Sequence, residues 1–129
     1  VEVLTQPCPG LVELIEAGDF EAEGLRGMLA DLVLPLLERG ADTLVLGCTH
    51  YPLVRGLIAD IAGPDVRIAD AGAAVARQVR HRLAEAGLLR TGDTPGTERF
   101  WTSAEPPAPT AALIRRLWGP PVAVAPLGC

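Results

Sequence analysis

The chain has 129 residues, of which 49% are hydrophobic and 21% are charged, and this composition is typical of a packed globular protein. Its net charge is -5 with no basic run, which argues against nucleic acid as a partner because phosphate binding needs clustered Arg and Lys. The chain contains no lysine, so it cannot supply the amine that pyridoxal phosphate requires, and no apolar run reaches the roughly 20 residues of a membrane helix. We therefore expect no pyridoxal phosphate and no membrane partner, and the three widely spaced cysteines fit a reducing cytoplasm better than a disulfide framework.

The first half of the chain alternates apolar runs with segments of helical spacing. Residues 1–4 predict a short strand, and residues 9–18 predict a helix that begins with a proline. Residues 23–38 place leucines on one face of a longer helix, in which we expect Pro35 to cause a kink. Residues 43–46 (TLVL) form a continuous apolar run, which predicts a strand covered on both faces.

The second half continues the same alternation. We expect helices at residues 52–61, 71–87 and 110–117, and strands at residues 66–69, 99–102 and 122–125. Because parallel strands need crossover connections, this order predicts an α/β fold with a largely parallel sheet and flanking helices. A change of domain is expected at residues 70–72.

The residues most suited to chemistry follow the TLVL run. Cys48 lies between this strand and the next helix, where open α/β sheets place their ligands, and a helix N-terminus would lower the pKa of its thiol. Thr49 offers a hydroxyl to a carboxylate, and His50 is close enough to exchange a proton with the thiol. A single cysteine is also often a small buried hydrophobe, and Cys-x-His has too few ligands for a zinc site. No metal is expected.

Residues 42–53 (DTLVLGCTHYPL) resemble the second cysteine signature of glutamate racemases. Residues 7–9 (PCP) and 14–18 (LIEAG) are similar to the family's Ala-Cys-Pro and Glu-Glu-Gly segment, and residues 100–103 also resemble the family. The likeness covers nearly the whole chain but only the carboxyl-terminal half of the family. It implies a two-domain, pseudo-symmetric fold.

In that fold, residues 1–69 would be the second half of the central α/β domain and would carry the GCTHYP site. Residues 70–129 would form a carboxyl-terminal segment that returns to the first α/β domain.

The resemblance also implies a role for each residue of the site. Cys48 would be the catalytic acid/base on the face that deprotonates L-glutamate, and it would contact the substrate together with Thr49. His50 would tune Cys48 or relay its proton. Glu16 would be the acidic residue near that pair, with Glu13 as a nearby alternative that we interpret as part of a solvated helix face.

By the same resemblance, the chain is an isomerase that interconverts L- and D-glutamate without a cofactor, by proton transfer between two cysteines. It would supply D-glutamate for peptidoglycan in the cytoplasm. The partner cysteine of the family lies in a Cys-Asn-Thr segment, and this chain contains no Asn, so Cys8 is not expected to be the second thiol. The missing amino-terminal half would supply it, and the chain alone is expected to be inactive; a homodimer stays open.

Three other interpretations remain. Aspartate racemases typically carry Glu in place of His50, which favours glutamate as the substrate. A thiol hydrolase could use a Cys–His pair through an acyl-enzyme. The chain could also be a non-catalytic binding or regulatory module.

Overall fold

The computed structural model describes residues 1–90, 92, 95–105, 108–119 and 122–128. These residues form two compact units. The first unit comprises Val1–Ile15 and Asp19–Thr91, and the second combines Glu16–Gly18 with the described residues from Gly92 onward. The prediction that residues 1–69 and 70–129 serve different domains stays a prediction.

The first part of the chain follows the predicted order of elements closely. It contains α1 (Leu11–Glu16), α2 (Glu23–Glu38), β1 (Thr43–Val45), the 3-10 helix η1 (Tyr51–Val54), α3 (Arg55–Ala62), β2 (Arg67–Ala69) and α4 (Gly72–Glu85). Helix α2 begins and ends at the predicted residues and continues through Pro35. The predicted strand at residues 1–4 is wrong, because this segment has no strand partner among the described residues.

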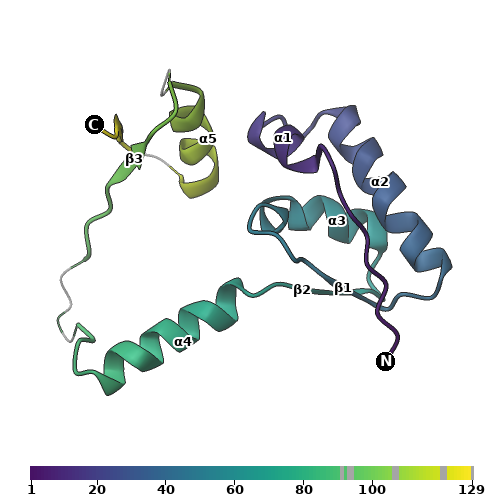
Figure 1. The fold of residues 1–129 in the computed structure, drawn as a ribbon, viewed down its shortest axis with the longest axis horizontal. Helices are drawn as coiled ribbons and strands as arrows, with labels where there is room; N and C mark the ends of the chain where they lie inside the picture. The colour runs from purple at the N-terminus through teal and green to yellow at the C-terminus, as the bar shows by residue number, and fades with distance from the viewer. Residues whose placement is uncertain (91, 93–94, 106–107, 120–121, 129) are drawn as a thin grey trace. The chain divides into compact units, whose positions relative to one another are not determined.

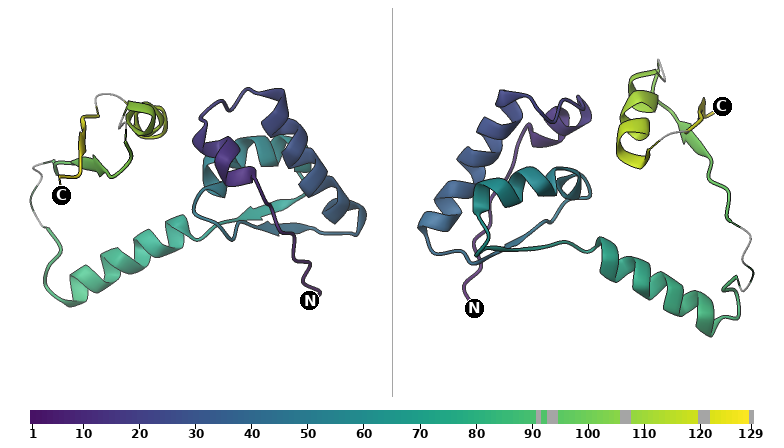
Figure 2. Two further views of the ribbon diagram at one scale, coloured as in Figure 1. Left: turned by 45° about the horizontal axis from the view of Figure 1, so that its top comes forward. Right: turned by 180° about the vertical axis from the view of Figure 1, so that it is seen from behind.

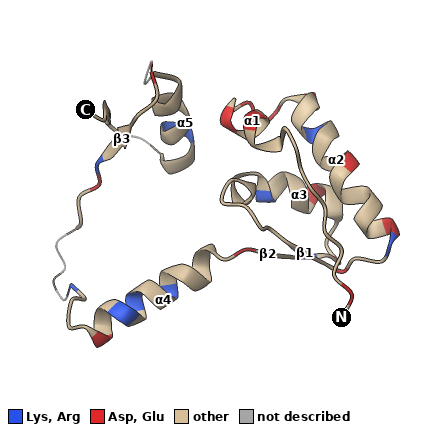
Figure 3. Ribbon diagram, in the orientation of Figure 1, with Lys and Arg blue, Asp and Glu red and all other residues tan. Residues whose placement is uncertain are grey.

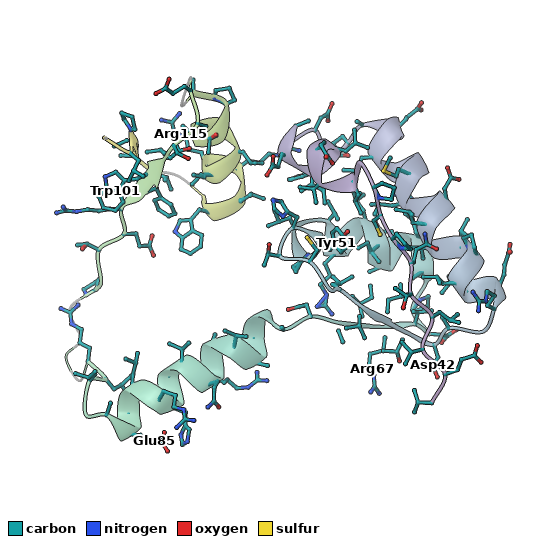
Figure 4. The ribbon with its side chains drawn as sticks, viewed as in Figure 1. Asp42, Tyr51, Arg67, Glu85, Trp101 and Arg115 are labelled. Atoms are coloured by element: carbon teal, nitrogen blue, oxygen red, sulfur yellow. The ribbon has the colours of Figure 1, made fainter. Side chains whose placement is uncertain are left out.

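The two strands of the first unit are parallel. Leu44 of β1 is in register with Ile68 of β2. The backbone N–H of Arg67 donates to the carbonyl of Asp42 at 2.9 Å, where both residues lie at the start of the strands (Figure 4). The crossover between the strands passes through α3, as an α/β fold with parallel strands requires.

Helices α1, α2 and α3 lie on one side of β1 and β2 (Figures 1 and 2). One cluster of buried apolar side chains fills the space between these elements: Leu11, Ile15, Leu25, Leu29, Val33, Leu44, Val54 and Ile58. Leu44 is 7% exposed, whereas the adjacent Val45 is 75% exposed. The expectation that this strand is covered on both faces is therefore wrong, since the described residues cover only the Leu44 face.

Helix α4 buries none of its side chains. Val75, Val79 and Leu83 form the predicted apolar stripe, with exposed fractions of 56%, 52% and 38%. Arginines occupy other positions of the same helix (Figure 3). Among the described helices, none is long and apolar enough to cross a membrane.

The second unit contains a further parallel strand pair. Strand β3 (Phe100–Thr102) pairs with β4 (Val124–Pro126), and α5 (Ala108–Trp118) connects them. The Trp118 indole N–H donates to the Glu98 carboxylate at 2.6 Å, and its ring meets Phe100 edge-on at 5.5 Å between centroids. Strand β4 begins two residues after the predicted start at residue 122.

Candidate active site

The loop that carries Cys48 leaves the carboxyl end of β1. Because β1 and β2 are parallel, they end at the same edge of the sheet, where Val45 is in register with Ala69. The backbone N–H of Leu46 still donates to the carbonyl of Ala69 at 2.9 Å, so this hydrogen bond to β2 holds the start of the loop in place. This edge is where open α/β sheets bind ligands.

The thiol of Cys48 is half-buried and has an imidazole beside it. Its Sγ lies 3.8 Å from His50 Nδ1. The backbone N–H of His50, which points at the sulfur, lowers the pKa of Cys48, and the His50 side chain lowers it further. Partial burial opposes this shift without reversing it. The thiolate is therefore more populated near neutral pH than that of an ordinary cysteine.

The groups that lower the pKa of Cys48 lie at the start of the next helical segment. The sequence predicted that the N-terminus of the following helix would act on the thiol. That segment begins as the 3-10 helix η1, and α3 starts only at Arg55. The donors that reach the sulfur belong mainly to His50, the N-cap of η1, and to a smaller extent to the backbone N–H of Tyr51, the first residue of η1.

Tyr51 follows directly and is partly buried against the core, next to α3 (Figure 4). Burial raises the pKa of Tyr51 to about 12, with further contributions from a hydrogen bond to Cys8 and from the charges of Cys8 and Cys48. The hydroxyl therefore stays protonated and donates to the sulfur of Cys8. This contact connects the Cys48 loop to the N-terminal segment, and the sequence had suggested only that Tyr51 packs.

An ion pair secures the neighbouring strand end. Arg55 Nη1 lies 3.2 Å from Asp70 Oδ2, and Arg55 Nη2 donates to the carbonyl of Ile68 at 3.0 Å. The other oxygen of Asp70 accepts the backbone N–H of Gly72 at 2.9 Å, at the start of α4. Sequence reasoning missed Arg55. The sequence signal for this ion pair is that Arg55 follows β1 and Asp70, of opposite charge, follows β2. Because parallel strands end at the same edge of a sheet, such residues can meet there.

The first unit contains the predicted site residues Cys48, Thr49 and His50. Cys48 and His50 are in contact, and Thr49 lies exposed between them. Glu16 is exposed at the end of α1 and groups with the second unit, so its role near the thiol stays a prediction. Glu13 is exposed on α1, and no group of three His, Cys, Asp or Glu residues suited to a metal occurs in the described part of the chain.

Comparison with known proteins relates this site to one enzyme family. No protein-family model matches the chain. The chain is 58% identical over 118 residues to the glutamate racemase of Pseudomonas putida strain F1. This match covers 92% of this chain and 44% of that protein. It is also 56% identical over 103 residues to the glutamate racemase of Methylococcus capsulatus. That match covers 80% of this chain and 38% of that protein.

Solved structures agree with this relationship. A glutamate racemase isoform from Bacillus anthracis matches 99% of the chain and 47% of its own length, with a TM-score of 0.83 and 27% identity. The glutamate racemase of Francisella tularensis, solved in complex with D-glutamate, shares the fold with a TM-score of 0.81 at 24% identity, and the match covers all of this chain and 48% of that protein. By homology the chain belongs to the glutamate racemase family, and it spans less than half the length of the curated relatives it matches.

Proposed function

We propose that this chain provides one of the two catalytic thiols of a cofactor-independent glutamate racemase. The observation that carries the proposal is the contact between Cys48 and His50 at the carboxyl end of β1, together with the lowered pKa of Cys48. A thiolate in this position is a base, and the neighbouring imidazole can exchange its proton. Glutamate is the proposed substrate because the relatives that this chain matches are glutamate racemases.

The proposed reaction needs one acid/base on each side of the α-carbon. The Cys48 thiolate removes the α-proton of L-glutamate, so that the C–H bond breaks and an S–H bond forms. A second thiol delivers its proton to the opposite face, where an S–H bond breaks and a C–H bond forms. The roles exchange in the reverse direction. Proton transfer is most efficient when the pKa of the acid/base lies near the working pH, and the pKa of Cys48 is lowered in that direction.

The surrounding side chains have supporting roles in this proposal. The His50 backbone N–H and imidazole stabilise the thiolate, and the imidazole relays its proton. Exposed Thr49 donates to a carboxylate of the substrate. Glu16 is the proposed acidic residue near the Cys–His pair. The product D-glutamate would serve peptidoglycan synthesis in the cytoplasm.

We further propose that the chain alone does not racemise glutamate. The family mechanism uses a second thiol from a Cys-Asn-Thr segment, and the chain has no Asn. The chain also spans only 44% of the Pseudomonas putida relative. The remaining part of the enzyme would supply the second thiol.

The test replaces the matching 118 residues of the Pseudomonas putida racemase with this chain, in a single polypeptide. We expect the chimera to form D-glutamate and to exchange the α-proton of glutamate in deuterated water. Cys48→Ala should abolish both activities, whereas Cys8→Ala should retain them. The isolated chain should show neither activity.

Three results would contradict the proposal at different points. An active chimera that tolerates Cys48→Ala would remove Cys48 from the mechanism. D-glutamate formation by the isolated chain, abolished by Cys48→Ala, would show that no second half is needed. A chimera that folds and binds glutamate without proton exchange would favour a non-catalytic binding module.

A further inference from the structure

Arg55 joins the helical segment that follows Cys48 to the carboxyl end of the neighbouring strand β2. Its Nη2 donates to the carbonyl of Ile68 at 3.0 Å, and its Nη1 lies 3.2 Å from Asp70 Oδ2. One planar guanidinium thus binds two acceptors in a fixed fork, a geometry that a lysine side chain does not reproduce. Arg55 therefore fixes the start of α3 at this edge of the sheet.

Backbone hydrogen bonds connect Arg55 to the Cys48 loop. Arg55 is the C-cap of η1, and His50 is its N-cap. The N–H of Tyr51 donates to the carbonyl of Cys48 at 3.3 Å. The N–H of Leu53 donates to the carbonyl of His50 at 3.0 Å. Because a hydrogen-bonded turn resists internal rearrangement, a displacement of Arg55 also displaces the thiol.

The acceptor Asp70 is itself held in place. Its Oδ1 accepts the N–H of Gly72 at 2.9 Å, at the first residue of α4, where the helix dipole favours a negative charge. A Cβ on Gly72 would lie 3.1 Å from the same oxygen, so glycine permits this close approach. The Asp70 side chain is only 19% exposed, and both of its oxygens have partners. Arg55 therefore binds a carboxylate of fixed orientation.

This contact matters for position more than for stability. The Arg55 side chain is 49% exposed, and such ion pairs add little to stability because solvent screens them and the side chains lose entropy. Neither Arg55 nor Asp70 belongs to the buried core of the first unit. The end of β2 lies beside the end of β1, where the Cys48 loop begins. The contact thus sets the position of this loop relative to the edge of the sheet.

We propose that Arg55 is a positioning residue for proton transfer by Cys48, with Asp70 and the carbonyl of Ile68 as its anchors. This proposal rests on the proposed function, because it assigns Arg55 to the same reaction. Arg55 acts through the backbone of η1 and not by contact with the substrate. Reacting atoms must approach to about 3–3.5 Å, and a misplacement of about 1 Å can cost on the order of a hundredfold in rate.

The experiment uses the covalent chimera with the Pseudomonas putida racemase and compares Arg55→Gln with Arg82→Gln. Arg82 provides a matched control, because it also forms an ion pair at 3.2 Å, with Glu85 in the last turn of α4. Arg55→Gln should lower kcat about tenfold and change KM by less than about twofold. Arg82→Gln should leave both constants unchanged. Arg55→Lys keeps the charge but not the fork, so it should recover only part of kcat.

A kinetic isotope effect identifies the step that Arg55 affects. Cys48 is the proposed base for L-glutamate, and the second thiol is the proposed base for D-glutamate. Arg55→Gln should therefore raise the primary isotope effect of α-deuterated L-glutamate more than that of α-deuterated D-glutamate. A loss of folded enzyme would lower kcat in both directions and leave both isotope effects unchanged. Asp70→Asn should act like Arg55→Gln, and the double variant should stay within about twofold of the weaker single variant, because both changes remove one contact.

Amide hydrogen exchange in the full 129-residue chain tests the positioning without catalysis. Arg55→Gln should speed exchange of the Tyr51 and Leu53 N–H groups about tenfold, because η1 loses its attachment to β2. Exchange at Leu29, in the core of the first unit, should rise by a smaller factor that reflects global stability. Arg82→Gln should change neither group.

Two outcomes would overturn the proposal. One is an Arg55→Gln chimera with the kcat and isotope effects of the parent chimera. The other is an Arg55→Gln chain in which exchange at Tyr51 and Leu53 rises no more than at Leu29. An inactive parent chimera would count against the proposed function alone, and the exchange pattern would then decide whether Arg55 positions the Cys48 loop.

Discussion

Tyr51 offers a direct test of the local structure around the candidate site, because it is the chain's one tyrosine. Burial, the hydrogen bond to Cys8 and the neighbouring thiols raise its pKa from 10.0 to about 12. At about pH 11, a phenol with this pKa is about 10% ionised, whereas an unperturbed phenol is about 90% ionised. The folded and unfolded chains should therefore differ strongly in phenolate absorbance at that pH.

The assay is an ultraviolet titration of the native chain and of the chain in concentrated guanidinium chloride. Circular dichroism at each pH verifies that the native sample is folded. Because the folded pKa is raised, the stabilisation from protonated Tyr51 is present below about pH 10 and is lost as the pH rises towards about 12. Native protein that ionises with a midpoint near 10 would refute the described environment of Tyr51.

Two cysteine variants divide the shift between its causes. Cys8→Ala removes both a hydrogen bond and a charge, so the midpoint should fall but remain above 10.0 because burial persists. Cys48→Ala removes only the smallest contribution and should change the midpoint less. The reverse order of effects would contradict the contact between Tyr51 and Cys8.

Three further predictions concern the thiol, the ion pair and the core. His50→Gln should raise the pKa of Cys48 in part, since its backbone N–H remains, and alkylation of Cys48 followed by mass spectrometry should shift to higher pH; an unchanged profile would contradict this. Arg55→Gln should lower the free energy of unfolding by about 1 kcal/mol in urea titrations, because its ion pair is partly exposed; a loss above about 3 kcal/mol would indicate a larger role. Leu29→Ala, at a side chain only 1% exposed, should lower this free energy by about 3 kcal/mol. Gly27→Ala, in the same helix with open space around the new Cβ, should raise it by about 0.5 kcal/mol, and equal effects would contradict the described core.

The sequence by itself determined the order and type of nearly all elements and the position of the reactive motif. Helix α2 was predicted to the residue, because apolar side chains spaced along a helix face reflect which side is buried. The place of Cys48 after a buried strand followed from the adjacent apolar run. Both inferences depend on patterns within a few residues of the chain.

The tertiary structure alone decided how distant segments pair. Residues 1–4 have the composition of a strand but form none, because a strand exists only where a neighbour accepts its hydrogen bonds. Only one face of β1 is covered for a similar reason, because the burial of a strand face depends on which other elements pack against it. Two contacts join residues that are far apart in the chain: the ion pair of Arg55 with Asp70 and the contact of Tyr51 with Cys8. Local periodicity does not predict such contacts.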